Sequence, residues 1–185
     1  GRLRLNLSAG PNTRRERANM SASVYAIATM DTKGRELLYT ADRLREAGVS
    51  VVTVDVGTGG EPSVRADVSA QTVAEFGCSG PLIDRPDRGP AIAAMGEALA
   101  RFLVSEHGAG KVAGVIGLGG SGGTALITPA MRALPIGLPK LMVSTVASGD
   151  TAAYVGCSDV CMMHSVVDVA GLNAVLRTVL ANAAH

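Results

Sequence analysis

Residues 117–124 read GLGGSGGT and follow the apolar run Val112–Ile116. The apolar run predicts a buried strand, and the pattern after the glycines predicts a short helix. Because glycine permits tight turns and a close approach of the backbone to a ligand, a strand, a glycine turn and a helix start together predict an anion site. Phosphate is the expected ligand group, since the first N–H groups of the helix point toward the turn.

The glycine turn matches the dinucleotide pattern G-x-G-x-x-G at Gly117, Gly119 and Gly122. A dinucleotide site also needs an acidic residue about 20 positions further on, to hold the ribose hydroxyls. Residues 139–142 are Pro-Lys-Leu-Met, and the first carboxylate after the turn is Asp150. NAD is therefore disfavoured as the ligand.

The same turn has the spacing of the phosphate loop G-x-x-x-x-G-K-[ST], with Thr124 where the metal-binding hydroxyl belongs. Gly123 stands in place of the lysine that would reach the β and γ phosphates, so this is not an ordinary phosphate loop. The alternative is a structural role, in which the glycines only allow a helix to pack closely on a sheet.

The composition narrows the class of protein. The chain has 185 residues, of which 47% are hydrophobic and 3% aromatic, so its core must be aliphatic, as in α/β proteins with buried parallel strands. A net charge of +1 and the scarcity of aromatic rings argue against a nucleic-acid partner. No apolar stretch approaches the roughly 20 residues of a membrane span and no signal pattern opens the chain, so a cytoplasmic protein without membrane contact is expected.

The first twenty residues are rich in arginine and end at Met20, after which a strand pattern begins. Residues 1–20 are interpreted as a leader or tag-derived arm, and residues 21–185 as one nucleotide-binding domain. A basic arm that binds an acidic partner is the alternative.

Strands and helices alternate after Met20, which predicts a single-domain, Rossmann-like, doubly wound α/β fold with a mostly parallel sheet. The expected strands are 24–30, 49–56, 112–116 and 139–146. The expected helices are 35–47, 68–76, 89–107, a short helix ending at 133, and 169–184, with an irregular segment before the last of them.

Four polar turns follow the four expected strands, at residues 31–34 (DTKG), 55–60 (DVGTGG), 117–124 and 144–151 (STVASGDT). Ligands of open α/β sheets bind at the carboxyl ends of the strands, so we expect one cleft lined by all four turns. The expected nucleotide-binding residues are Asp31, Thr32, Lys33, Gly34, Asp55, Gly57, Thr58, Gly117, Gly119, Gly120, Ser121, Gly122, Gly123, Thr124, Thr145, Ser148, Gly149, Asp150 and Thr151.

Within this cleft Lys33 is expected to supply the positive charge for the phosphates, because Gly123 stands where an ordinary phosphate loop has its lysine. Asp31, Asp55 and Asp150 are candidate ligands of Mg²⁺, which prefers carboxylates and phosphate oxygens. The base and ribose are expected toward Gly57, Thr58 and the 60–90 segment. Singly, several of these residues have a plain alternative as helix caps or as solvated first-turn side chains.

The three cysteines do not predict a disulfide framework, because the number is odd and the chain is long. Cys157, Cys161, His164 and Asp168 would share one face of a continuous helix and could bind a soft metal there. Gly156 and the β-branched residues 166–167 argue against such a helix, so buried structural cysteines are the favoured interpretation.

Several phrases of the chain are similar to the N-terminal domain of the Tm-one-like family, which comprises the tomato mosaic virus resistance protein of tomato and uncharacterised bacterial relatives. The similar phrases are IATMDTKG at 27–34, DVG at 55–57, GVIGLGGSGGT at 114–124, AMRALPIGLPKLMVSTVASGD at 130–150 and SVVDVAGLN at 165–173. The resemblance covers about residues 23–184.

The resemblance implies an ATP-binding domain that uses magnesium and that is followed, in the family, by a second α/β domain of similar size. It carries a nucleotide-contact role to residues 31–34, 117–124 and 144–150. The inhibition of viral replication by the plant protein does not transfer, and Cys157, Cys161 and His164 are not part of the shared motif.

Together, the residues and the resemblance predict a domain that grips the ATP triphosphate with the N–H groups of residues 119–124, assisted by Lys33 and Mg²⁺. It would be half of a two-domain, nucleotide-dependent protein, such as a ligase or kinase half-site. No catalytic residue is assigned, and Asp150 is the only candidate general base.

Two other classes of function stay open. One is a binding or assembly module in which Leu172, Val175, Leu176, Val179 and Leu180 bury the last helix against a second copy or another chain. The other is an enzyme that uses the glycine turn for a sugar phosphate or CoA.

Overall fold

The computed structural model describes residues 22–77, 88–167 and 171–185. Within them a single five-stranded, all-parallel sheet has the order β2-β1-β3-β4-β5. This is the doubly wound order of flavodoxin-like proteins, which confirms the predicted Rossmann-like class. The strands are β1 (Ser23–Ala28), β2 (Val51–Asp55), β3 (Val112–Gly119), β4 (Lys140–Ser144) and β5 (Cys161–His164).

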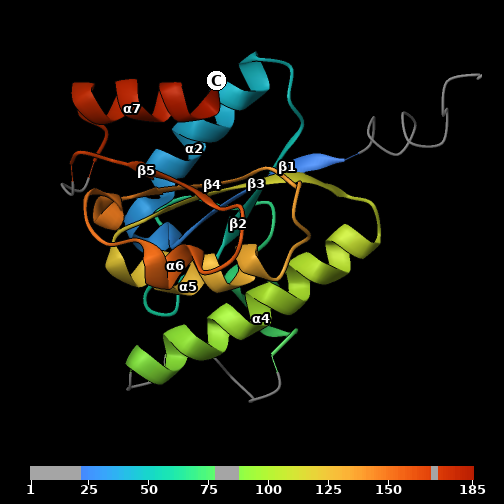
Figure 1. The fold of residues 1–185 in the computed structure, drawn as a ribbon. Helices are drawn as coiled ribbons and strands as arrows, with labels where there is room; N and C mark the ends of the chain where they lie inside the picture. Colours follow the sequence, from blue (N-terminus) through green and yellow to red (C-terminus); the bar gives the residue numbers. More distant parts are fainter. Residues whose placement is uncertain (1–21, 78–87, 168–170) are drawn as a thin grey trace, which may run out of the picture.

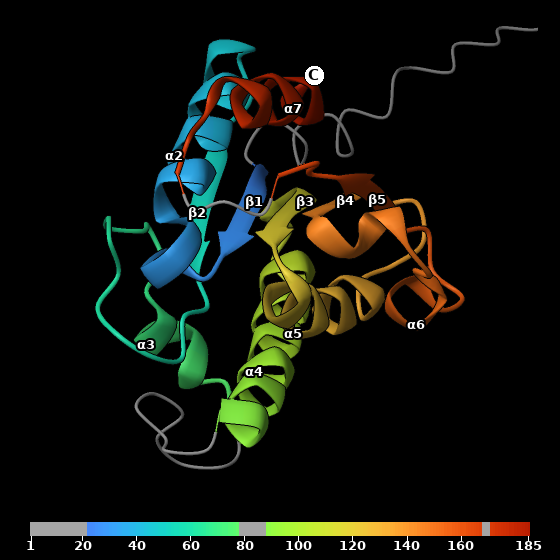
Figure 2. The ribbon, with the colours of Figure 1, turned by 90° about the vertical axis from the view of Figure 1, so that its left-hand side faces the viewer.

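Helices cover both faces of the sheet (Figures 1 and 2). The first and last helices of the described chain pack together on one face, and the helices between β2 and β4 cover the other. The helices are α2 (Met30–Glu46), α3 (Ala70–Ala74), α4 (Arg88–Gly108), α5 (Ser121–Arg132), α6 (Ala152–Val155) and α7 (Ala174–Ala184), with a 3₁₀ turn η1 (Thr145–Ser148).

The sequence of β1 explains why the sheet is buried on both sides. Tyr25 and Ile27 belong to the apolar cluster under α3, α4 and α5, while Ala26 and Ala28 belong to the cluster under α2 and α7. Successive side chains of a strand point to opposite faces, so a parallel strand between two helical layers must be apolar at every position. This is the physical reason for the continuous aliphatic runs in the sequence.

The prediction of irregular structure before the last helix was wrong, because this segment contains the helix α6 and the edge strand β5. β5 has only four residues, CMMH, without a β-branched side chain, so its sequence gives little strand signal. Cys161 and His164 lie at its two ends and both are exposed. Cys157 is exposed as well, so the interpretation of Cys157 and Cys161 as buried was wrong. The helix that would have gathered a metal site does not form, and Cys78 and Asp168 lie outside the described residues.

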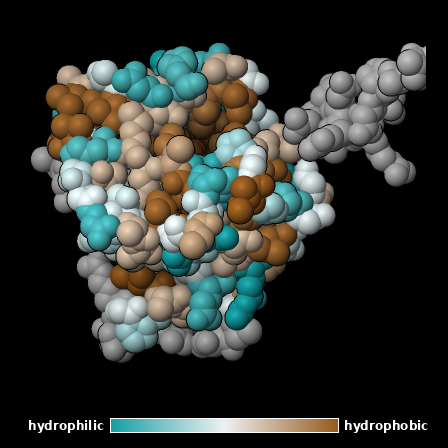
Figure 3. All heavy atoms as spheres, viewed as in Figure 1, coloured by the Kyte–Doolittle hydropathy of each residue, from teal (hydrophilic) through white to brown (hydrophobic). Residues whose placement is uncertain are grey.

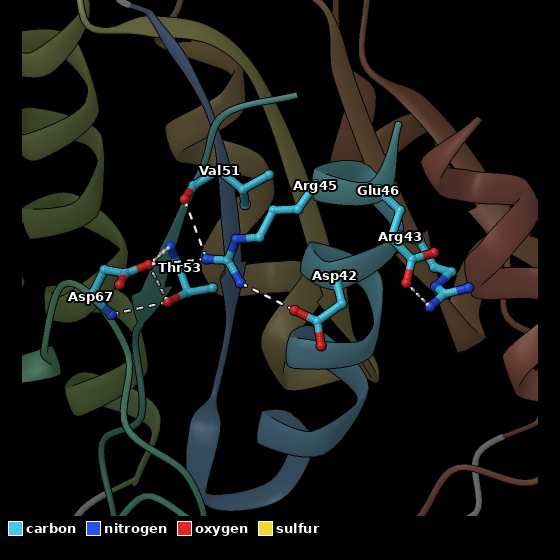
Figure 4. A network of polar contacts seen from close by, with 7 residues as sticks. All are labelled: Asp42, Arg43, Arg45, Glu46, Val51, Thr53 and Asp67. Carbon is cyan, nitrogen blue, oxygen red and sulfur yellow. Dashed lines mark hydrogen bonds and ion pairs between the residues drawn. The ribbon is translucent and has the colours of Figure 1, made fainter. Parts of the chain in front are cut away.

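The segment after β2 folds back along the edge of the sheet. Asp67 accepts hydrogen bonds from the backbone N–H and the hydroxyl of Thr53, at 2.8 and 2.7 Å. Asp67 also lies 3.5 Å from the guanidinium of Arg45 in α2, which donates to the carbonyl of Val51. Figure 4 shows these side chains converging on β2. The network holds Asp67, which follows the 57–66 connection, against β2.

The same network predicts a pH dependence of stability. Burial acts to raise the pKa of Asp67, but the hydrogen bonds from Thr53 and the charge of Arg45 outweigh it and lower the pKa below its ordinary value of 3.8. Because the pKa is lower in the folded chain than in the unfolded chain, this stabilisation is complete above about pH 4 and is lost as the pH falls through the folded pKa.

Asp67→Asn is therefore expected to lower the free energy of unfolding at pH 7 by about 1 kcal/mol or less and to flatten its decline in acid. Urea unfolding between pH 3 and pH 7 measures both effects. Asp42→Asn is the matched control, because Asp42 is 61% exposed and its bond to Arg45 is a single contact of 3.3 Å. Equal acid profiles for the two variants would contradict the role of Asp67.

Candidate functional site

A cavity of about 330 Å³ lies beyond the carboxyl ends of the neighbouring strands β1 and β3. In a sheet of this order β1 and β3 flank the switch point, where ligands of doubly wound proteins bind. The chain segments after β1, β2 and β3 all contribute to its wall. The lining residues are Thr29, Asp31, Thr32, Lys33, Thr58, Ile92, Gly120, Ser121, Gly122, Gly123 and Leu126.

The glycine turn presents the start of α5 to this cavity. Gly120 is the N-cap of α5, and Ser121, Gly122 and Gly123 form its first turn. The first N–H groups of a helix have no acceptor within the helix and carry its positive dipole end, which together attract anions. α5 has 12 residues, so this dipole is that of a full helix.

Thr124 is bonded to the glycine turn from within the protein and does not line the cavity. Its side chain is buried, and its hydroxyl donates to the carbonyl of Gly120 at 2.7 Å and lies 2.6 Å from the hydroxyl of Ser144. The Thr124 hydroxyl therefore does not face the cavity, which argues against its predicted role in binding metal. Its contact with Ser144 joins the start of α5 to the end of β4.

Gly117 and Gly119 serve packing instead of lining the cavity. A Cβ at Gly117 would lie 2.7 Å from the sulfur of Met142, and a Cβ at Gly119 would lie 2.9 Å from the Cα of Gly123. These two glycines let α5 lie directly against the end of β3. Their close contacts fit the structural alternative, whereas Gly120, Gly122 and Gly123 border the cavity.

The DTKG turn forms a kink at the start of α2, which was predicted to begin only at Arg35. Lys33 has non-helical angles (φ −122°, ψ 16°), and the carbonyl of Met30 accepts bonds from the N–H and hydroxyl of Ser63 at 3.0 and 2.8 Å. A glycine is required at position 34, where the connection after β2 crosses α2, because a Cβ there would lie 2.6 Å from Ser63 Oγ. Asp31 and Lys33 face the cavity, and Gly34 does not.

Two carboxylates converge beneath the turn. Asp55 is buried and its Oδ1 accepts hydrogen bonds from the N–H groups of Met30 and Gly57, at 2.9 and 2.8 Å. A Cβ built on Gly57 would lie 3.2 Å from Asp55 Oδ1 and 3.6 Å from Asp31 Oδ1, so the two side chains approach the same backbone position. Gly57 is buried between them and does not line the cavity.

Asp31 has the electrostatics of a cation ligand. Its Oδ1 is buried without a hydrogen-bond partner among the described residues. Burial, and next the charge of Asp55, raise the pKa of Asp31 above its ordinary value. An unpaired carboxylate oxygen beside a second carboxylate fits Mg²⁺, which is often held by one or two carboxylates together with phosphate oxygens.

Asp150 is not part of this pair. It is exposed, and its Oδ1 accepts a hydrogen bond of 2.9 Å from the N–H of Ala152 at the start of α6. Among the described residues no group of three or more histidine, cysteine, aspartate or glutamate side chains could hold a metal ion. Of the three aspartates predicted as Mg²⁺ ligands, the structure thus brings Asp31 and Asp55 together and leaves Asp150 with a partner at the start of α6.

The turn after β4 stands apart from the cavity, so three of the four expected turns meet there. Thr145 borders a separate small cavity next to α7, Ser148 and Gly149 are exposed, and Thr151 precedes α6. None of them belongs to the described lining of the main cavity. The contact between Ser144 and Thr124 links the end of β4 to the start of α5, and Thr145 borders the same small cavity as Lys33.

Three lining residues were missed by sequence reasoning. Thr29 follows β1 as the N-cap of α2, and Ile92 and Leu126 form an apolar wall from α4 and α5. Ile92 and Leu126 show an ordinary helical core pattern, which carries no sign that two helices meet at a cavity. Thr58 lies at the cavity as predicted.

The last helix offers less free apolar surface than predicted. Leu176 and Leu180 are buried in the core cluster shared with α2, at 3% and 1% exposure. Val175 is 51% exposed, and apolar atoms gather over α7 at the upper left of Figure 3. Within the part of the chain that the structure describes, none of the helices combines the length and apolar character needed to cross a bilayer.

The chain resembles bacterial proteins over most of its length. It is 55% identical over 164 residues to a UPF0261 protein of Rhizobium meliloti, which covers 88% of this chain and 40% of the relative. It is 42% identical over 171 residues to a UPF0261 protein of Clostridium tetani, covering 90% of this chain and 42% of the relative.

A plant protein shares the same region. The ToMV resistance protein Tm-1 of Solanum lycopersicum is 42% identical over 183 residues, covering 88% of this chain and 24% of the plant protein. The chain thus spans about two fifths of the length of the bacterial relatives named above.

A family model supports the same assignment. Residues 22–185 match the N-terminal domain of the uncharacterised protein family UPF0261. Together with the relatives, this match confirms the resemblance inferred from the glycine turn and its neighbouring phrases. The chain belongs to the UPF0261 family and represents its N-terminal domain.

Proposed function

We propose that this domain binds ATP with magnesium, with the triphosphate in the cavity between the glycine turn and the DTKG turn. The observation that carries the proposal is the cavity itself, where the first turn of α5 faces the side chains of Asp31 and Lys33. A helix start, a lysine and an aspartate are the three groups that recognise a phosphate chain and its cation. ATP, among phosphate ligands, follows from the resemblance to the Tm-one-like family.

In this proposal the N–H groups of residues 120–123 contact phosphate oxygens, and Lys33 supplies the charge that a phosphate-loop lysine gives elsewhere. Asp31 would hold Mg²⁺, with Asp55 orienting the turn through the N–H groups of Met30 and Gly57. The cation would neutralise phosphate charge. Ile92 and Leu126 give the cavity an apolar side, against which an uncharged part of the ligand can pack.

The cavity contains no evident general base for hydrolysis. Asp31 is the acidic residue among its described lining residues, and the proposal assigns it to the cation. We therefore propose binding without rapid turnover, in a domain whose chemistry is completed by a second domain. Localisation in the cytoplasm and homo-oligomer formation are parts of the same proposal.

Isothermal titration of residues 20–185 tests the proposal, with ATP in the presence and absence of Mg²⁺ and with NAD as control. Magnesium-dependent binding of ATP and no binding of NAD are expected, together with slow release of phosphate. No heat with ATP, or rapid hydrolysis by this chain alone, would refute the proposal.

Asp31→Asn separates the cation role from the fold. Since the folded pKa of Asp31 is raised, its ionisation destabilises the fold as the pH rises through that pKa. The variant is expected to raise the thermal midpoint at pH 7 by a few degrees while removing the magnesium dependence of ATP binding. Differential scanning fluorimetry and the same titration measure these effects, and a variant that keeps full magnesium dependence would contradict the assignment.

An assembly module is the second candidate, and the exposed Val175 on α7 favours it. Such a module would self-associate through α7 with or without nucleotide. Sedimentation of Val175→Lys distinguishes the two candidates, because Val175 is exposed on α7 and is not among the described residues that line the cavity. Loss of a dimer with unchanged ATP binding would assign assembly to α7 and leave the nucleotide proposal standing.

A further inference from the structure

Glu36 is a charged residue buried in α2, with only 3% of its surface exposed. Its Oε1 lies 3.6 Å from Nζ of Lys33 and accepts a hydrogen bond of 3.1 Å from the N–H of Gly171. A buried ion pair adds little net stability, because removing both charges from water costs about as much as their attraction returns. Fold stability alone therefore does not account for this pair at the edge of the cavity.

Lys33 stands between two cavities. It lines the 330 Å³ cavity and also a space of about 20 Å³ on the α7 side, which Glu36 and Ser165 border. The Lys33 side chain is only 16% exposed, which is low for a lysine. The kink in α2 removes this residue from regular helix geometry, so its direction depends on local partners, and Glu36 is the carboxylate that contacts it.

Backbone strain also lies close to this pair, in the residues after β5, of which Ser165 and Val167 border the same small cavity as Glu36. Val166 has φ 67°, a left-handed conformation that a β-branched residue rarely adopts. Next to it, the N–H of Ser165 donates to the carbonyl of Ser144 at the end of β4. Strain of this kind persists where the surroundings enforce it, and it clusters near functional sites.

We propose that Glu36 is a positioning residue, which holds the Lys33 ammonium at the cavity wall for a phosphate group and joins it to the segment before α7. The inference rests on the proposed function, because it takes a phosphate as the ligand of Lys33. When a long side chain is held in place before the ligand arrives, less conformational entropy is lost on binding. Loss of this contact is therefore expected to weaken the affinity for ATP about fivefold.

Glu36→Gln tests the proposal, since glutamine keeps the size and the acceptor for Gly171 but removes the charge. The matched control is Glu46→Gln, because Glu46 pairs with Arg43 at the same spacing in α2 but is 58% exposed. Two quantities are measured: the rate at which trace acetic anhydride acetylates Lys33, followed by mass spectrometry, and the affinity for ATP. Glu36→Gln is expected to raise the acetylation rate several-fold and to weaken ATP about fivefold, while Glu46→Gln changes neither.

An unchanged acetylation rate in Glu36→Gln would overturn the proposal. Faster acetylation with unchanged or tighter ATP binding would also overturn it, because the carboxylate would then hold Lys33 without helping the phosphate. If the wild-type chain binds no ATP, the proposed function fails, and the acetylation rates alone decide whether Glu36 holds Lys33. Should Glu36→Gln unfold, Glu36→Asp withdraws the carboxylate by one methylene and gives the same two readouts.

Discussion

Gly122→Leu is expected to weaken ATP binding at least about 30-fold, or about 2 kcal/mol, without loss of the fold. Gly122 is exposed in the first turn of α5, and a Cβ there would meet only Cδ1 of Ile92, at 3.8 Å. A leucine side chain therefore fits the protein and occupies the cavity instead. Leucine also favours a helix over glycine by about 0.8 kcal/mol, so the thermal midpoint should stay level or rise.

Titration calorimetry and thermal unfolding of the same samples measure the two effects. Gly108→Leu is the control, because it makes the same change near the end of α4, where a Cβ would have no atom within 4 Å. The control should keep full affinity. Wild-type affinity in Gly122→Leu would mean that the ligand does not occupy this cavity, and unchanged self-association in a non-binding variant would separate assembly from nucleotide binding.

Gly119→Ala is expected to have the largest effect on stability, about 3 kcal/mol. The added Cβ would lie 2.9 and 3.0 Å from Cα and C of Gly123 and 3.1 Å from N of Thr124. All three are backbone atoms of α5, so no side chain can move aside and the helix itself must shift. For a chain of this size the thermal midpoint should fall by about 6–10 °C.

Gly123→Ala is the matched control for this effect. A Cβ at Gly123 would make an ordinary contact of 3.6 Å with the carbonyl of Leu118, so its stability should be unchanged or slightly higher. Thermal unfolding followed by circular dichroism compares the two variants. A Gly119→Ala midpoint within 2 °C or so of the wild type would contradict the close packing of α5 on β3.

The parts of the fold that the sequence predicted have strong local signals. The apolar side chains before Gly117 predict a strand, and the glycines after it predict a turn and a helix start through their backbone freedom. The edge strand β5 was missed because its four residues lack a strand composition. The kink at Lys33 was missed because it depends on Ser63, 30 positions away, which takes the Met30 carbonyl out of the helix.

In the candidate site, too, residues with a local signal in the sequence were predicted, whereas a contact between two distant helices was not. The cavity lining contains Asp31, Lys33 and Gly120, as the order of turns along the chain suggested. The order of turns also predicted that Asp31 and Asp55 lie in one cleft, and the structure brings them together at Gly57. The apolar wall at Ile92 could not be predicted, because it forms only where α4 and α5 meet in space. The prediction that the turn after β4 lines the cavity was wrong. A polar turn at a strand end looks the same in sequence whether or not its strand borders the switch point.

The central claim is that the N–H groups of residues 120–123 hold the phosphates. An amide NMR titration of the isotopically labelled chain with ATP and Mg²⁺ tests it most directly, because it reads those N–H groups themselves. The account predicts the largest shifts at Gly120, Ser121, Gly122 and Gly123, with smaller ones at Thr32 and Lys33. Shifts confined to other parts of the chain, or none at millimolar ATP, would contradict it.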